Sequence, residues 1–173
     1  MNKLQKVTIG LILPVALLLS GCAVGGTNNI DTKAPVASQP SATPDNPTQR
    51  KLGGVVTYKD GLSVSVSLPA AYTPSAQAAG VIDGSTNIIF NVVIINNSKK
   101  NADVGGFPTV NSGGVSASAI SDFENKVGVP PNTTLLPSQS ITFQDAYSVK
   151  DQADITYLIT PGLDYRQAIF TSK

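Results

Sequence analysis

The chain contains no histidine, no tryptophan and only one cysteine, and these absences exclude several kinds of chemistry. Histidine is the commonest general base, proton shuttle and metal ligand in proteins. Without it, Ser-His-Asp and Cys-His catalysis are excluded, together with the usual zinc and copper sites. One cysteine cannot close an intramolecular disulfide, so the fold has to be stabilised by its hydrophobic core.

Charge is also sparse, because Asp, Glu, Lys and Arg make up 13% of the sequence. The longest basic runs are the pairs Arg50-Lys51 and Lys99-Lys100. If the first 21 residues are removed, the twelve Lys and Arg become ten against eleven Asp and Glu, a net charge of −1. Nucleic-acid binding requires a concentrated positive surface, so no nucleic-acid partner is expected.

The N-terminus has the three parts of a secretory signal. Two lysines occur among the first six residues, an apolar stretch covers residues 7–19, and Ser20-Gly21 precede Cys22. The apolar stretch is shorter than the roughly 20 residues that a transmembrane helix needs. Residues 1–21 are therefore predicted to be a signal peptide rather than a membrane anchor.

The run Leu19-Ser20-Gly21-Cys22 resembles the lipobox of bacterial lipoproteins. This resemblance implies that the sulfur of Cys22 receives a diacylglyceryl group and that the Gly21–Cys22 bond is then cleaved. The alternative is an ordinary signal peptide in which the cysteine is incidental. Because two acyl chains give stable membrane attachment, the expected location is the extracytoplasmic face of the cell membrane.

Two further segments follow the signal peptide. Residues 22–51 contain the lipidated cysteine and a stretch rich in Pro, Ser, Thr and Asn, a composition typical of a disordered tether. Residues 52–173 have the length of one domain with a single core.

The pattern within this domain indicates β-structure throughout. Leu62, Val64 and Val66 alternate with serines, and Asp60-Gly61 before them predicts a hairpin turn. Residues 88–95 form an apolar, β-branched run suited to a central strand covered on both faces. Further strands are expected at residues 53–58, 114–120, 140–149, 154–160 and 165–171.

One short helical turn is expected in an otherwise all-β domain. Ser121 and Glu124 have the spacing of a capping box, and Gly128 is suited to end a helix. About seven strands in this length favour an immunoglobulin-like antiparallel β-sandwich, with a small barrel as the alternative. The expected core comprises Val64, Val66, Ile89, Phe90, Val92, Ile94, Phe143, Tyr157 and Phe170.

Three segments together resemble a known family: Asp60–Val66, Asn87–Asn96 and Leu135–Phe143. They are similar to the immunoglobulin-like extracellular domain of many Gram-positive, especially actinobacterial, lipoproteins. The resemblance spans about Gly54 to Thr171 and rests on structural motifs. That family has no agreed catalytic residues, so the resemblance implies a fold and a location but no active site.

Carboxylates are the remaining source of catalytic or metal-binding chemistry. Asp122 lies close in sequence to Glu124, and Asp151 lies close to Asp154. A glycosidase needs two carboxylates across a sugar cleft, usually with aromatic platforms, and aromatic residues make up 6% of the chain. The sequence favours structural roles for both pairs. Calcium could use the oxygens of residues 150–154, but that segment lacks the EF-hand spacing, so no metal or cofactor is expected.

The loop at residues 105–114 is the best candidate contact surface, because its paired glycines permit unusual backbone angles around Phe107. Phe107 anchors a partner if it is exposed; the alternative, which the sequence favours, is that it packs into the core. The leading hypothesis is a non-enzymatic, lipid-anchored module that binds a protein or cell-wall partner. The alternatives are an accessory subunit of a membrane transporter or envelope enzyme complex, and an Asp/Glu-dependent cell-wall hydrolase.

Overall fold

The computed structural model describes residues 47–173. The signal peptide, the lipidation site at Cys22 and most of the predicted tether lie outside these residues. Within residues 47–173 no helix is long and apolar enough to cross a membrane.

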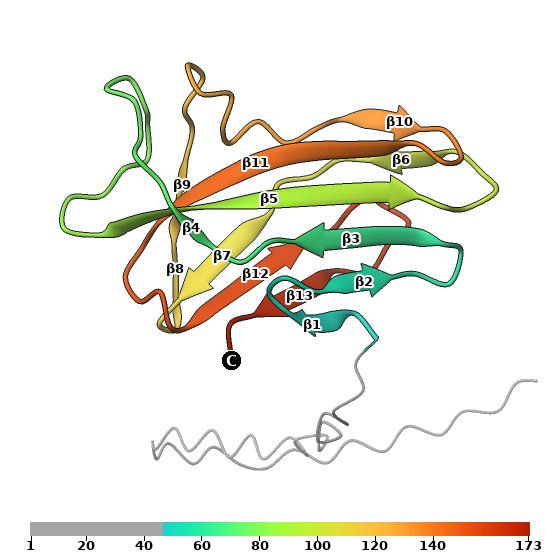
Figure 1. Cartoon of the computed structure of the whole chain (residues 1–173), viewed down its shortest axis with the longest axis horizontal. Helices are drawn as coiled ribbons and strands as arrows, with labels where there is room; N and C mark the ends of the chain where they lie inside the picture. The colour runs from blue at the N-terminus through green and yellow to red at the C-terminus, as the bar shows by residue number, and fades with distance from the viewer. Residues whose placement is uncertain (1–46) are drawn as a thin grey trace, which may run out of the picture. The chain divides into compact units, whose positions relative to one another are not determined.

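The described part of the chain contains thirteen strands and no helix (Figure 1). The strands are β1 (Gln49–Lys51), β2 (Val55–Thr57), β3 (Leu62–Val66), β4 (Ala70–Ala71), β5 (Thr86–Asn96), β6 (Ala102–Val104), β7 (Thr109–Ser112), β8 (Val115–Ser116), β9 (Ser118–Ile120), β10 (Thr133–Leu135), β11 (Ser140–Val149), β12 (Ile155–Ile159) and β13 (Ala168–Thr171). The predicted all-β class is confirmed, and the strand count exceeds the expected seven because several strands have only two to four residues.

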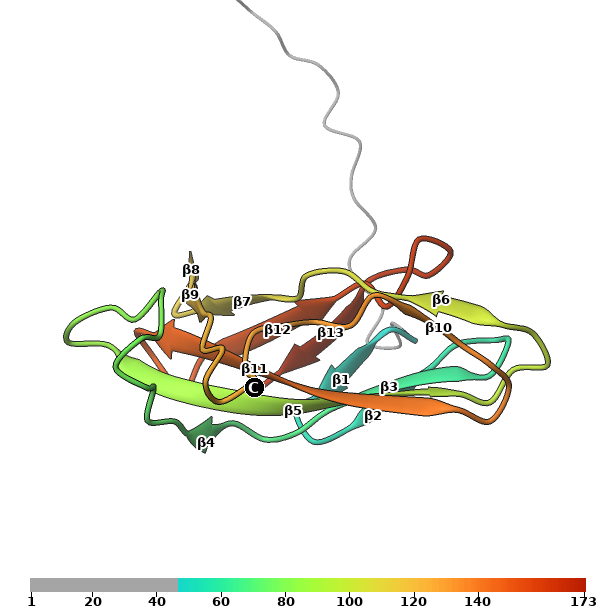
Figure 2. The same ribbon diagram turned by 90° about the horizontal axis from the view of Figure 1, so that it is seen from above.

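The strands form two main layers, which are seen edge-on in Figure 2. One sheet has the order β1-β13-β12-β7-β8, and the other has the order β2-β3-β5-β11-β9 with β4 added beside β5. A separate two-stranded ribbon pairs β10 with β6. All pairs are antiparallel except β1 with β13. The antiparallel β-sandwich predicted from the sequence is thus confirmed.

The long β5–β11 pair is the centre of its sheet. Its register is continuous from Ser140↔Ile95 to Val149↔Thr86, and β3 pairs with the other edge of β5. Side chains on a strand alternate between faces, so every second residue of β5 from Ile88 to Ile94 is buried. The outer face of β5 is half-buried or exposed, so β5 is covered fully on one face only, whereas the apolar run predicted cover on both.

Seven of the nine expected core residues are buried: Val64, Val66, Phe90, Val92, Ile94, Tyr157 and Phe170. The other two, Ile89 and Phe143, are partly buried. Ile89 lies on the outer face of β5, where it packs against a small second cluster of Ile120, Val127 and Ala146. Its neighbours on β5 take the inward positions because a strand alternates strictly and Phe90 faces the core.

Three aromatic rings meet at the centre of the sandwich. Phe90 contacts Tyr157 and Tyr147 edge-on, with ring centroids 5.0 and 6.3 Å apart. The Tyr157 hydroxyl donates a 2.6 Å hydrogen bond to Oδ2 of Asp145, which is itself buried. Asp145 is the only charged residue of β11, and its carboxylate connects this strand to β12 in the opposite sheet.

The predicted helical turn is wrong. Residues 123–126 form a turn closed by an antiparallel bridge between Asp122 and Val127, and Lys126 has a left-handed φ of 56°. The physical reason is that Asp122, rather than Ser121, accepts the hydrogen bond from the Asn125 amide, while donors from residues 72 and 75 hold the same carboxylate. These long-range bonds replace the local capping box.

One strand lies before residue 52, where the composition predicted that the domain begins. Gln49–Lys51 form β1, which runs parallel to β13, and the Thr48 carbonyl accepts a hydrogen bond from the Ile169 amide. Such pairing uses backbone groups only. Because all three side chains of β1 are exposed, no apolar pattern marks the strand in the sequence.

The buried Asp145 leads to a prediction about pH. Burial raises the pKa of Asp145 to about 6, partly offset by the Tyr157 hydrogen bond. The folded state therefore favours the protonated acid. This contribution is fully present below about pH 4, where an unfolded aspartate is protonated too, and is lost as the pH rises through 6. At about 1.4 kcal/mol per tenfold change in proton affinity, the loss is ~3 kcal/mol.

We expect Asp145→Asn to remove this dependence, because a neutral amide can still accept from Tyr157. Urea unfolding of both proteins between pH 4 and pH 8 measures the effect as the difference between their free energies of unfolding. The free energy of unfolding of the variant should increase relative to that of the wild type as the pH rises. Two curves that stay parallel over this range would contradict the raised pKa.

Candidate binding groove

Three loops meet at one place on the domain surface. They are residues 105–108 between β6 and β7, residues 128–132 before β10, and residues 160–167 between β12 and β13. Between them lies a hollow of about 570 Å³, lined by residues 103–107, 130–132, 160 and 162–164. We refer to this hollow and its lining as the groove.

Glycines allow two of these loops to approach closely. The Gly105 amide donates a 2.9 Å hydrogen bond to the Pro161 carbonyl, which joins the first loop to the third. A Cβ atom on Gly162 would lie 2.2 Å from the Asp103 carbonyl oxygen, a distance that real side chains do not adopt. Gly106 has a φ of 108°, which L-residues with a side chain rarely adopt. The groove therefore depends on glycine at these positions.

Phe107 is 86% exposed at the edge of the groove. The sequence favoured a core position for this ring, and the structure corrects that expectation. The residue that turns inward is its neighbour Pro108, which is buried and whose carbonyl accepts a 2.9 Å hydrogen bond from the buried Tyr147 hydroxyl. The Phe107 side chain is left facing solvent between Gly106 and Pro108.

A second apolar side chain, Leu163, is fully exposed in the third loop. No local pattern in the sequence marks Leu163 as a contact residue, because its exposure depends on how the loop packs. Tyr165 in the same loop donates a 2.9 Å hydrogen bond to Asp60, and its ring meets that of Tyr58 edge-on with centroids 5.0 Å apart. These contacts tie the third loop to the β2–β3 hairpin.

The two tyrosines remain hydrogen-bond donors at neutral pH. Burial raises the pKa of Tyr58 to about 12, and its hydroxyl donates a 2.6 Å bond to the Arg166 carbonyl. Burial, followed by the bond to Asp60, raises the pKa of Tyr165 to about 12. The third loop is thus fixed near its C-terminal end by two protonated hydroxyls.

The charged residues of the groove lining are both acidic: Asp103 on β6 and Asp164 in the third loop. Oδ1 of Asp103 accepts a 2.5 Å hydrogen bond from the Thr134 hydroxyl of β10. No lysine or arginine belongs to the lining. Sequence reasoning missed both aspartates, because only the packing of the three loops brings them to one surface.

The first predicted carboxylate pair is used structurally. Asp122 is buried and accepts hydrogen bonds from the Tyr72 hydroxyl, the Ser75 amide and hydroxyl, and the amide and side chain of Asn125. These donors, led by the Ser75 amide, hold the pKa of Asp122 well below its usual range. Glu124 is exposed in the adjoining turn. An acid held ionised by five donors is unsuited to proton transfer.

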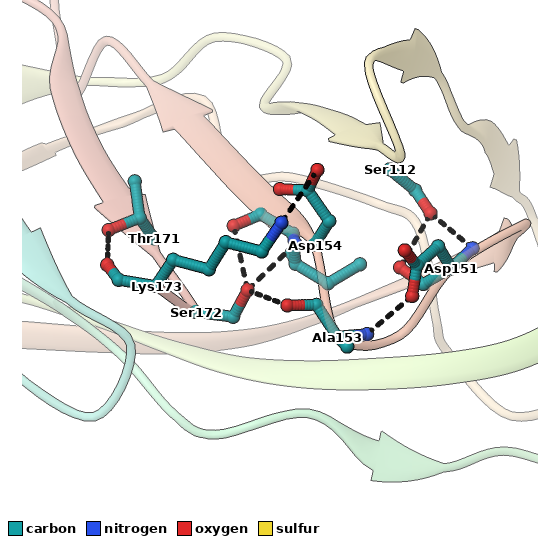
Figure 3. Close-up of polar contacts among 8 residues, drawn as sticks. Ser112, Asp151, Ala153, Asp154, Thr171, Ser172 and Lys173 are labelled. Atoms are coloured by element: carbon teal, nitrogen blue, oxygen red, sulfur yellow. Dashed lines mark hydrogen bonds and ion pairs between the residues drawn. The ribbon is translucent and has the colours of Figure 1, made fainter.

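The second pair lies in the turn between β11 and β12 (Figure 3). Asp151 accepts a 2.9 Å bond from the Ala153 amide, and its backbone exchanges two hydrogen bonds with the Ser112 hydroxyl. Asp154 forms a 3.1 Å ion pair with Lys173. Within residues 47–173 no group of three or more acidic, His or Cys side chains is arranged to hold a metal ion. Neither carboxylate pair belongs to the groove lining.

Comparison with known proteins identifies similar folds but does not identify the function of this chain. No protein-family model and no curated protein matches the sequence. The solved structure of yjhA from Bacillus subtilis has a TM-score of 0.54 at 14% identity, over 70% of this chain and 98% of that one. The ycdA protein of the same organism, described as a lipoprotein, has a TM-score of 0.52 at 17% identity over 65% of this chain.

This chain spans 36% of ycdA, so the two proteins differ in extent. The secreted protein MPT63 of Mycobacterium tuberculosis has a TM-score of 0.47 at 14% identity, over 73% of this chain and 98% of that one. At the identities of yjhA and ycdA, similarity establishes a shared fold alone. The groove therefore has to be interpreted from its own residues.

The groove yields a prediction about Gly162. We expect Gly162→Ala to push the third loop away from β6 and to lower the free energy of unfolding by about 1–3 kcal/mol, the usual cost of overpacking. Hydrogen exchange of the Gly105 amide, which bonds to Pro161, should become faster.

The control is Gly84→Ala, where a Cβ atom has no neighbour within 4 Å and the cost is only the backbone strain of an alanine at a φ of 76°, away from the groove. This variant should leave exchange at Gly105 unchanged. Equal exchange rates at Gly105 in both variants would show that the groove does not depend on the close approach of Gly162 to Asp103.

Proposed function

We propose that this protein is a lipid-anchored, extracytoplasmic binding module without catalytic activity, and that it contacts a protein or cell-wall partner through the groove. The observation that carries the proposal is the exposed Phe107 ring, held by its neighbours at the edge of a hollow. Exposed aromatic anchors in pockets contribute much of the energy of many interfaces. Loops on a rigid sandwich are common sites of recognition.

Two observations support a role in binding rather than catalysis. The buried Asp122 and the turn residues Asp151 and Asp154 have structural partners, and none of them lines the groove. The groove lining also has no nucleophile paired with a general base, since its titratable side chains are two aspartates. The cell-wall hydrolase hypothesis gains no support from this arrangement.

The extracytoplasmic location rests on the signal sequence and the lipobox that ends at Cys22. The fold similarity to ycdA, described as a lipoprotein, is compatible with it. The lipobox also supports the second candidate function, an accessory subunit of a membrane complex, because a lipid anchor would confine the domain to the membrane surface.

Anchoring is tested by Cys22→Ala in a chain whose signal peptide is cleaved without a lipidated cysteine. Without the thiol no diacylglyceryl group can be attached, so we expect the variant to leave the membrane fraction. Ser20→Ala is the control, because it keeps a small residue before the cleavage bond and should remain membrane-associated. A Cys22→Ala protein found wholly in the membrane fraction would contradict lipid anchoring.

Binding through Phe107 is tested by cross-linking in intact cells. A photoreactive phenylalanine analogue at position 107 should form adducts with a partner, whereas the same analogue at the exposed Phe123, in the 123–126 turn, should not. Phe107→Ala should reduce affinity for that partner on the order of thirtyfold, the size typical of an aromatic hot spot. Phe123→Ala serves as the matched control.

The identity of the adduct separates the two candidate functions. One dominant integral membrane protein, lost in the Cys22→Ala protein, would indicate an accessory subunit. A wall or extracellular partner retained by Cys22→Ala would indicate an independent binding module. Adducts at position 123 but not at position 107 would overturn the assignment of the groove.

A further inference from the structure

The groove combines apolar surface with charge of one sign. Phe107 and Leu163 are exposed beside it, and Pro130 and Pro131 form part of its wall. The charged side chains of the lining are the two aspartates, and no cation accompanies them. From this combination we infer that the groove binds a polypeptide segment in which a lysine or arginine lies next to an apolar side chain. The inference rests on the proposed function and specifies its partner.

The state of the two carboxylates supports a cationic ligand. Asp103 is oriented by the Thr134 hydroxyl through Oδ1, and within residues 47–173 no donor reaches its Oδ2 atom. No donor from the same residues reaches the carboxylate of Asp164, which is exposed. A guanidinium or ammonium group would satisfy these oxygens, and charge-assisted hydrogen bonds to carboxylates are the stronger kind. The domain itself supplies no such group in the groove.

The apolar part of the groove favours a peptide over a glycan or a lipid surface. Glycan recognition usually places flat aromatic platforms against sugar rings, and the groove has the single ring of Phe107 beside an aliphatic leucine. An anionic membrane surface would be repelled by Asp103 and Asp164. A peptide with an apolar side chain next to a basic one would match both the apolar and the acidic residues of the lining.

The groove is also accessible and fixed before any partner binds. Tyr147 holds the Phe107 loop through Pro108, and Tyr165 holds the third loop through Asp60. A surface that is already ordered loses little conformational entropy on binding, which raises its affinity for a short segment. The arrangement therefore suits an extended peptide more than a partner that must reshape the loops.

The test uses the mature chain with Cys22→Ala, so that the protein is soluble, and a displayed library of random peptides. Selection should enrich peptides in which Lys or Arg adjoins Leu, Ile, Val or Phe. Affinities of one enriched peptide are then measured for the wild type, Asp103→Asn/Asp164→Asn, Phe107→Ala and a control, Asp83→Asn/Glu124→Gln. The control removes two exposed negative charges outside the groove.

We expect the Asp103→Asn/Asp164→Asn protein to bind about five- to tenfold more weakly, since two exposed ion pairs contribute modestly. The control should bind like the wild type. Added salt should weaken binding to the wild type and leave the Asn variant nearly unaffected. Thermal unfolding of each variant confirms that the substituted side chains, all at the surface, leave the fold intact.

Each contrary result has a distinct meaning. The inference would be overturned by enriched peptides without basic residues, or by equal affinity for the Asn variant and the wild type. In either case, weaker binding by Phe107→Ala would still identify the groove as the binding site. Equal affinity for Phe107→Ala and the wild type would overturn both. If no peptide is enriched, the inference of a polypeptide ligand is wrong. Cross-linking at position 107 then tests the proposed function separately.

Discussion

The hydrogen bond between Tyr157 and Asp145 joins the two sheets, and the packing of the core is arranged around it. A buried carboxylate without a donor would be strongly destabilising, so Tyr157 has to face it. The rings of Phe90 and Tyr147 pack beside this pair. Immunoglobulin domains of antibodies fill the same space with a tryptophan against a disulfide. A chain that has neither residue fills it with three aromatic rings and one acid.

The same core residues determine how the groove is presented. Tyr147 lies two positions after Asp145 on β11 and therefore faces the same side of the strand. Its hydroxyl reaches the Pro108 carbonyl, which fixes the backbone next to Phe107. The exposure of Phe107 is thus a consequence of core packing and not of a loosely held loop. A binding surface built on such a support is pre-ordered.

Local patterns in the sequence predicted the elements that depend on local information. Leu62–Val66 forms the strand that its alternation predicted, and Ser140–Val149 forms a strand with the predicted bounds. The capping box at Ser121 failed because Tyr72 and Ser75, distant in sequence, hold Asp122. The groove could not be predicted for a related reason, because its aspartates and Leu163 come together only when the three loops pack against one another. The sequence identified Phe107 as a candidate contact, but its exposure depends on a long-range bond to Pro108.

Anchoring changes what affinity the groove requires. One aromatic ring, one leucine and two carboxylates form a small contact, which would bind a free segment weakly. Under the proposed lipidation of Cys22, the domain and a membrane-associated partner share one surface. Such tethering produces effective concentrations on the order of millimolar, so a weak contact can still be occupied. The modest size of the groove is therefore consistent with a module whose specificity comes from its residues and whose occupancy comes from its anchor.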